Sequence, residues 1–155
     1  MSVRTDDIAS REVEVVEEFA LFDDWMDKYE HIIELGRDLP RIDDAYKDEE
    51  HRIRGCQSQV WLHAQPENER LRFTADSDAV ITKGLISLMV RVLDGQPARE
   101  IAAAELGFLD RIGLHEHLSP TRSNGLRSMV KQMRLYGVAH AAKRDAASAK
   151  TIRDE

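Results

Sequence analysis

The sequence predicts an α+β fold, in which a small antiparallel sheet packs against helices. Three observations predict this class. Apolar residues recur at helical spacing near both ends of the chain, two segments of alternating polarity are joined by a turn, and a long apolar stretch follows them. A length of 155 residues fits one domain with a single core. We therefore expect one domain over residues 1–155, with its core at about 12–138 and flexible ends at the N-terminus and at 140–155.

Residues 8–38 are predicted to form two helices. Asp23 or Asp24 can cap the second helix, and Pro40 stops it. The polar segment 41–54 has no sustained period and predicts a surface loop. The expected apolar stripes are Val13, Val16, Phe19 and Ala20 in the first helix, and Met26, Tyr29, Ile32, Ile33 and Gly36 in the second.

A β-hairpin is predicted next, with its turn at residues 66–69. Ile53 is a candidate for a short additional strand before the hairpin. The alternating apolar positions are Val60, Leu62 and Ala64 in the first strand, and Leu71, Phe73 and Ala75 in the second.

The segment 79–93 is apolar nearly all round, which predicts a buried central helix. The cluster Asp76-Ser77-Asp78 is expected to cap it. A short helix is expected at about 99–106, followed by a short helical or irregular stretch at 107–113. The proline, glycine, hydroxyl and amide residues of 114–125 indicate a loop, and the last helix is expected to begin near Thr121 or Ser123.

Charge and composition exclude several classes of function. The net charge of −7 argues against a general nucleic-acid binder. No apolar run is long enough to cross a bilayer and no signal-peptide core is present, so a cytoplasmic protein without membrane partners is expected. One cysteine excludes an internal disulfide and metal sites built on several thiolates. Phosphate-binding GxxxxGK[ST] and GxGxxG motifs are missing from the sequence.

That cysteine, Cys56, lies in the run Gly55-Cys56-Gln57-Ser58-Gln59-Val60-Trp61. A glycine before it and small or amide residues after it indicate a reactive thiol on a loop leading into a strand. Two alternatives stay open: a small buried side chain, or the nucleophile of a self-contained cysteine enzyme that uses His115 or His117 as its base. The pair His115 and His117 could also bind a metal, but no third ligand is evident, so no metal site is expected.

The run from Gly55 to Trp61 resembles the signature of the SufE family of sulfur acceptors, which work beside cysteine desulfurases in iron–sulfur cluster assembly. Three further stretches resemble the family in the same order, and together the four span about residues 12–135. They are Tyr29–Gly36 with Leu39-Pro40, Asp76–Asp78 through Lys83–Leu85, and His117–Leu126.

The resemblance implies a covalent sulfur carrier rather than an enzyme. Cys56 would take persulfide sulfur from a SufS- or CsdA-like cysteine desulfurase, stimulate that pyridoxal-phosphate enzyme, and pass the sulfur to a SufBCD-like iron–sulfur scaffold. It also implies a fold similar to that of the scaffold protein of the other assembly system (IscU-like), with no cofactor of its own. The matching site residues are Gly55, Gln57, Ser58 and Gln59 in the cysteine loop, and Asp78, His117 and Arg122 in neighbouring loops.

One departure concerns the approach to the cysteine. Family members often carry asparagine a few residues before it, whereas this chain has His51 after the acidic run 48–50. The sequence therefore predicts a more acidic loop and a changed preference among partners.

Overall fold

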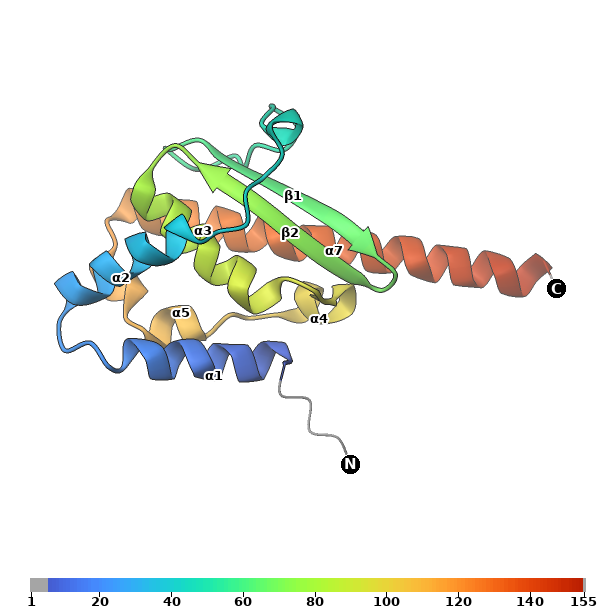
Figure 1. Ribbon diagram of the computed structural model, residues 1–155. Coiled ribbons are helices and arrows are strands. Elements are labelled where there is room, and N and C mark those ends of the chain that lie inside the picture. The colour runs from blue at the N-terminus through green and yellow to red at the C-terminus, as the bar shows by residue number, and fades with distance from the viewer. Residues whose placement is uncertain (1–5, 155) are drawn as a thin grey trace.

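A computed structural model of the protein describes residues 6–154, with side chains through Ser148 (Figure 1). The elements in chain order are α1 (Ile8–Phe19), α2 (Trp25–Arg37), the 3-10 helix η1 (Asp44–Tyr46), β1 (Val60–Glu67), β2 (Arg70–Ser77), α3 (Val80–Leu93), β3 (Gln96–Pro97), α4 (Ala98–Ala103), α5 (Phe108–Arg111), α6 (Leu114–His117) and α7 (Pro120–Asp154). The α+β class is confirmed. No helix in this described part of the chain is both long and apolar enough to cross a membrane.

The sheet is antiparallel, in the order β1-β2-β3. The predicted hairpin is confirmed, and its register pairs Val60 with Ser77 and Glu67 with Arg70. The turn is tighter than expected because Asn68 adopts a positive φ of 55°, which lets the strands continue to Glu67 and Arg70. The third strand is β3. The segment at Ile53 forms an isolated antiparallel bridge to β1 between Arg52 and Trp61, in which the N–H of Ile53 donates to the carbonyl of Val60 at 2.8 Å.

Helix α3 is the buried centre of the molecule, as predicted. It packs against α2 and β2, and Figure 1 shows α3 and α7 on one side of the hairpin. The crossing with α2 depends on two glycines. A β-carbon on Gly36 would lie 2.8 Å from the backbone nitrogen of Gly84, and one on Gly84 would overlap the carbonyl oxygen of Ile32. The two backbones therefore touch directly, which only glycine permits.

The predicted apolar stripes of α1 and α2 are partly wrong. Val13 is 46 % exposed, whereas Val15 and Phe19 are buried. Met26 is 66 % exposed. Valines at neighbouring positions in α1 fit two helical faces equally well, so only contact with the rest of the fold selects the buried face.

Helix α7 begins before the predicted position and replaces much of the predicted loop 114–125. Pro120 is its first residue, where a missing N–H costs nothing, and the hydroxyl of Ser119 accepts a hydrogen bond from the backbone of Arg122 at 3.3 Å. The helix continues to Asp154, and His140 contacts the carbonyl of Asn68 at 2.7 Å. The expected flexibility of 140–155 stays a prediction, and the expected flexible N-terminus falls largely on residues 1–5, outside the described residues.

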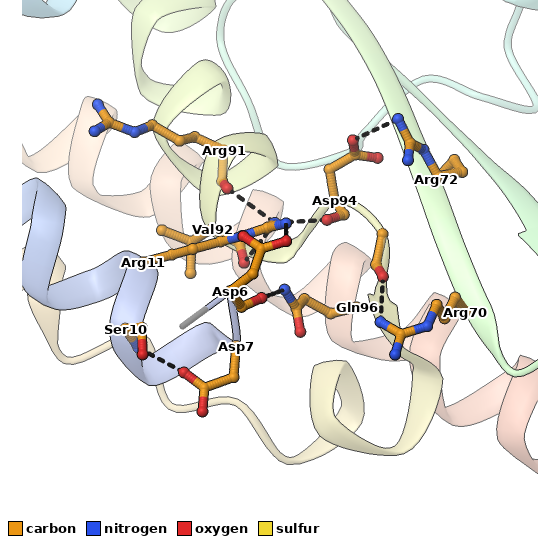
Figure 2. A network of polar contacts seen from close by, with 11 residues as sticks. Asp6, Asp7, Ser10, Arg11, Arg70, Arg72, Arg91, Val92, Asp94 and Gln96 are labelled. Carbon is orange, nitrogen blue, oxygen red and sulfur yellow. Dashed lines mark hydrogen bonds and ion pairs between the residues drawn. The ribbon is translucent and has the colours of Figure 1, made fainter. Parts of the chain in front are cut away.

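The first turn of α1 is joined to the end of α3 by Arg11 (Figure 2). Its guanidinium donates to the carbonyls of Arg91 at 3.2 Å and Asp94 at 2.6 Å, which are unpaired acceptors at the helix C-terminus. The side-chain amide of Gln96 donates to the carbonyl of Asp6 at 2.7 Å. This contact network holds α1 against α3, the element that forms one wall of the site described next.

Candidate functional site at Cys56

The cysteine loop, residues 53–59, lies between Arg52, which forms a β-bridge with Trp61, and Val60, the first residue of β1. Gly55 has a φ of +91°, and a β-carbon there would overlap the hydroxyl of Ser128. Glycine is therefore required here, because other residues rarely adopt this φ and because Ser128 leaves no space for a β-carbon. The predicted placement of Cys56, on a loop leading into a strand, agrees with this geometry.

Cys56 faces a small cavity of about 130 Å³ between the loop, α3 and the start of α7. The thiol is half-buried, and its sulfur lies 3.5 Å from the carbonyl oxygen of Gly125. The cavity is lined by Cys56, Gln57, Ser58, Ala79, Ile81, Thr82, Leu85, Thr121, Arg122, Gly125 and Met129. The lining therefore combines apolar side chains with hydroxyls, one amide and one guanidinium.

Burial raises the pKa of the Cys56 thiol, and the positive charge of Arg52 opposes this effect without cancelling it. In this conformation the sulfur is therefore held as a thiol and not as a thiolate. The nucleophilic form needs either a change in the surroundings of the sulfur or a cation brought by another molecule.

The loop is fixed to the start of α3 by a reciprocal pair of hydrogen bonds. The backbone N–H of Gln59 donates to the carboxylate of Asp78 at 3.0 Å, and the N–H of Asp78 donates to the carbonyl of Gln59 at 3.2 Å. The hydroxyl of Thr82 lies 3.4 Å from that of Ser58. These contacts join the loop to α3 on the far side of the cavity from α7.

The prediction that residues 76–78 cap α3 is mostly wrong. The N-cap residue is Ala79, which has no side-chain cap, although its N–H donates to the hydroxyl of Ser77 at 3.2 Å. Asp76 instead pairs with Lys47 at 2.8 Å and with Lys83 at 3.3 Å. The carboxylate of Asp78 accepts from the N–H of Gln59 and does not cap the helix.

Arg122, which the family resemblance assigned to a neighbouring loop, is one of the residues that line the cavity. Its guanidinium carbon is 6.0 Å from the ring centroid of Tyr29 on α2, a cation–π geometry. The side chain is exposed and has no carboxylate partner among the described residues. A positive charge thus lines the same cavity as Cys56 and is available for an anionic group that enters it.

The two histidines of α6 do not reach Cys56. His117 stacks on Trp25 at 4.5 Å between ring centroids, and its Nδ1 lies 2.9 Å from the carbonyl of Gly113. His115 pairs with Asp110 at 3.7 Å. The residues that line the cysteine cavity include neither histidine, so the geometry offers no base in contact with the thiol.

One cluster among the described residues has the composition of a metal site. Side-chain atoms of Asp48, Glu50 and His51 lie within 4.8 Å of one another. Both carboxylates are exposed, and Asp48 already accepts hydrogen bonds from the backbone and from Nδ1 of His51. The cluster does not include Cys56 and does not join the cysteine cavity.

Sequence reasoning missed the wall that α7 contributes. Thr121, Gly125 and Met129 recur every four residues and therefore face the cavity together. The combination Ser119-Pro120 was the available signal, because it marks a helix start and would have placed these residues on one helical face.

The family profile for SufE, described as an Fe-S metabolism associated domain, matches residues 13–136. The chain belongs to the SufE family. An uncharacterized SufE-like protein of Rhizobium etli is 42 % identical over 134 residues, which cover 83 % of this chain and 90 % of the relative. The sulfur acceptor protein CsdE of Escherichia coli is 36 % identical over 113 residues, which cover 72 % and 77 %.

One further relative and one solved structure resemble this chain. The chloroplastic/mitochondrial SufE-like protein 1 of Arabidopsis thaliana is 40 % identical over 121 residues, which cover 77 % of this chain and 33 % of that longer protein. The solution structure of a hypothetical protein from Thermus thermophilus superposes with a TM-score of 0.71 at 19 % identity, covering 85 % of this chain and 96 % of that one. This likeness supports the fold alone.

Proposed function

We propose that this protein is a sulfur acceptor that takes sulfane sulfur from a cysteine desulfurase onto Cys56. It stimulates the desulfurase by removing its persulfide and passes the sulfur to an iron–sulfur scaffold. The observation that carries the proposal is a single thiol at the mouth of a small cavity, in a chain that is 36 % identical to a protein named as a sulfur acceptor. We place this activity in the cytoplasm.

The transfer is a redox-neutral thiol exchange. The thiolate of Cys56 attacks the outer sulfur of the desulfurase persulfide, a new S–S bond forms on Cys56, and the old S–S bond breaks. The bonding electron pair leaves on the desulfurase thiolate, and the proton of the Cys56 thiol goes to solvent or to a base of the partner. Delivery repeats the same step, with an acceptor thiolate attacking the sulfur held on Cys56.

The surroundings of Cys56 suit the holding of a persulfide more than they suit nucleophilic attack by the thiol. Its raised pKa keeps the free protein in the unreactive thiol form. A persulfide is more acidic than a thiol, and Arg122 at the cavity mouth would stabilise its negative charge. Because Cys56 is half-buried and its sulfur rests against Gly125, we expect residues 55–59 to move outward when the desulfurase docks.

Pyridoxal phosphate belongs to the partner in this scheme, and the chain needs no cofactor of its own. The pyridoxal-phosphate enzyme generates the persulfide, and the carrier contributes the accepting thiol and its shelter. The other candidate, a self-contained cysteine enzyme with His115 or His117 as its base, is disfavoured because both side chains have other partners and neither lines the cavity.

Intact-protein mass spectrometry tests the proposal directly. Wild type and Cys56→Ser are incubated with a cysteine desulfurase, pyridoxal phosphate and cysteine, with an incubation lacking the desulfurase as a control. Mass gains equal to whole sulfur atoms, reversed by a reductant and missing in the variant, are expected. Normal sulfur relay by Cys56→Ser would reject the proposal. Turnover of a small substrate by the isolated protein would favour the cysteine-enzyme alternative.

A further inference from the structure

A second and larger cavity lies on another flank of α7. Its volume is about 430 Å³, and it is formed by α4, α5, α6, the loop between α4 and α5, and α7. None of its lining residues belongs to the cavity at Cys56. Cavities that bind small organic ligands have volumes of about 300–1,000 Å³ and mostly apolar walls, with a few polar groups that orient the ligand. This cavity is of that size.

Most of the exposed lining is aliphatic. Its aliphatic residues include Leu106, Leu109, Leu114, Leu126, Val130 and Val138. Two further observations show that this surface is not fully covered by the fold itself: Leu135 is 47 % exposed and Val138 is 50 % exposed. Covering such surface with an alkyl chain is favourable by about 25 cal/mol per Å² removed from water.

One edge of the cavity is positively charged. Arg127, Lys131 and Arg134 recur every three or four residues of α7 and therefore lie along the same side of the helix. Among the described residues Arg127 and Lys131 have no ion-pair partner, while Arg134 donates to the carbonyl of Ala102 at 3.3 Å. The cavity thus combines an apolar wall with two uncompensated cations.

The acidic groups that line the cavity do not cancel these cations. The lining carboxylates are Glu105 and Asp110, and Asp110 lies 3.7 Å from the imidazole of His115. Three cations therefore face two carboxylates, and neither carboxylate forms an ion pair with Arg127 or Lys131 among the described residues. A ligand with a cationic head would be repelled along the α7 edge, and a purely inorganic anion would leave the aliphatic wall exposed to water.

We propose that this cavity binds a medium-chain fatty acid anion. The alkyl chain would lie along the aliphatic wall, and the carboxylate would lie between Arg127 and Lys131. This inference concerns a different site from Cys56 and does not depend on the sulfur-acceptor function.

To test this, isotope-labelled full-length protein is titrated with decanoate below its critical micelle concentration. Binding is monitored through the amide chemical shifts in NMR spectra. Decyltrimethylammonium, with the same chain and opposite charge, is the ligand control. Saturable one-to-one binding of decanoate is expected, with the largest shifts at 102–115 and 123–138. Arg127→Glu combined with Lys131→Glu should weaken binding about tenfold or more. Lys143→Glu with Arg144→Glu on the exposed end of α7 is the matched variant and should bind like wild type.

Several outcomes would overturn the proposal. They are a non-saturable response to decanoate, equal binding of the cationic detergent, and unchanged affinity in the Arg127/Lys131 variant. Protection of Cys56 from alkylation, with shifts confined to its loop, would place the ligand in the other cavity. If a cysteine desulfurase shifts 123–138 and decanoate does not, the groove takes a protein segment and the fatty-acid assignment is wrong.

Discussion

The sulfur of Cys56 lies 3.5 Å from the carbonyl oxygen of Gly125, which is 69 residues later in the chain. A β-carbon on Gly125 would lie 3.5 Å from that sulfur, an ordinary van der Waals distance. The second turn of α7 therefore forms a cover over the thiol, and the missing side chain of Gly125 leaves space beside the sulfur.

Gly125→Ala should stabilise the fold and impair sulfur loading. Replacing glycine in a helix interior by alanine gains up to about 1 kcal/mol, and the new methyl group meets no clash. The same methyl group occupies the space beside Cys56, so persulfide formation should slow several-fold. Thermal unfolding and mass spectrometry after timed incubation with a desulfurase measure the two effects. Loading at the wild-type rate would show that this space is not used.

Gly84→Ala should destabilise the protein by about 3 kcal/mol, because its methyl group would overlap the carbonyl oxygen of Ile32. Gly107→Ala is the matched control, since a β-carbon there has no heavy atom within 4 Å. Urea unfolding of both variants gives the comparison. Equal midpoints for the two would contradict the close contact of α2 with α3.

The stability of the wild type should decrease with rising alkaline pH more steeply than that of Cys56→Ser. Burial raises the pKa of the thiol in the folded state, so above the ordinary thiol pKa the unfolded chain loses a proton that the folded chain keeps. The stabilising contribution is complete below the unfolded pKa and is lost as pH rises through the folded pKa. Tyr136, whose pKa is also raised by burial, is present in both proteins and cancels in the difference. Parallel stability curves would show that the thiol is not buried.

Iodoacetamide should alkylate Cys56 slowly in the folded protein at neutral pH, and Asp78→Ala should increase the rate several-fold. Removing the carboxylate deletes the acceptor for the N–H of Gln59 and loosens the loop from α3. Asp78→Asn keeps an oxygen acceptor and should give a smaller increase. Alkylation rates at several pH values separate a change in the exposure of Cys56 from a change in the ionisation of its thiol. A rate that is unaffected in both variants would mean that this bond does not hold the loop.

Local chemistry in the sequence is sufficient for several parts of the structure. Strict alternation defines the hairpin 60–77, continuous apolarity defines α3, and Asp24 caps α2 as expected, accepting from the N–H of Asp27 at 2.9 Å. The same holds for the loop position of Cys56, because a glycine with positive φ and small or amide neighbours are properties of the run itself.

Tertiary structure decided the rest. Whether Val13 or Val15 of α1 is buried depends on which face meets α3, since both positions satisfy a helical period. Asp78 does not cap α3 as expected, because its carboxylate accepts instead from the N–H of Gln59, 19 residues earlier in the chain. The wall over Cys56 comes from Gly125, and His117 turns to Trp25 instead of the thiol.

The sequence by itself determined the class of fold, the family and the identity of the one thiol. It could do so because periodicity, turn chemistry and a lone cysteine are local properties of the chain. Only the folded structure decided what surrounds that thiol, how far its pKa is moved from the ordinary range, and which cations of α7 remain without partners. These properties depend on distances between residues far apart in the chain, and burial and charge pairing act through such distances.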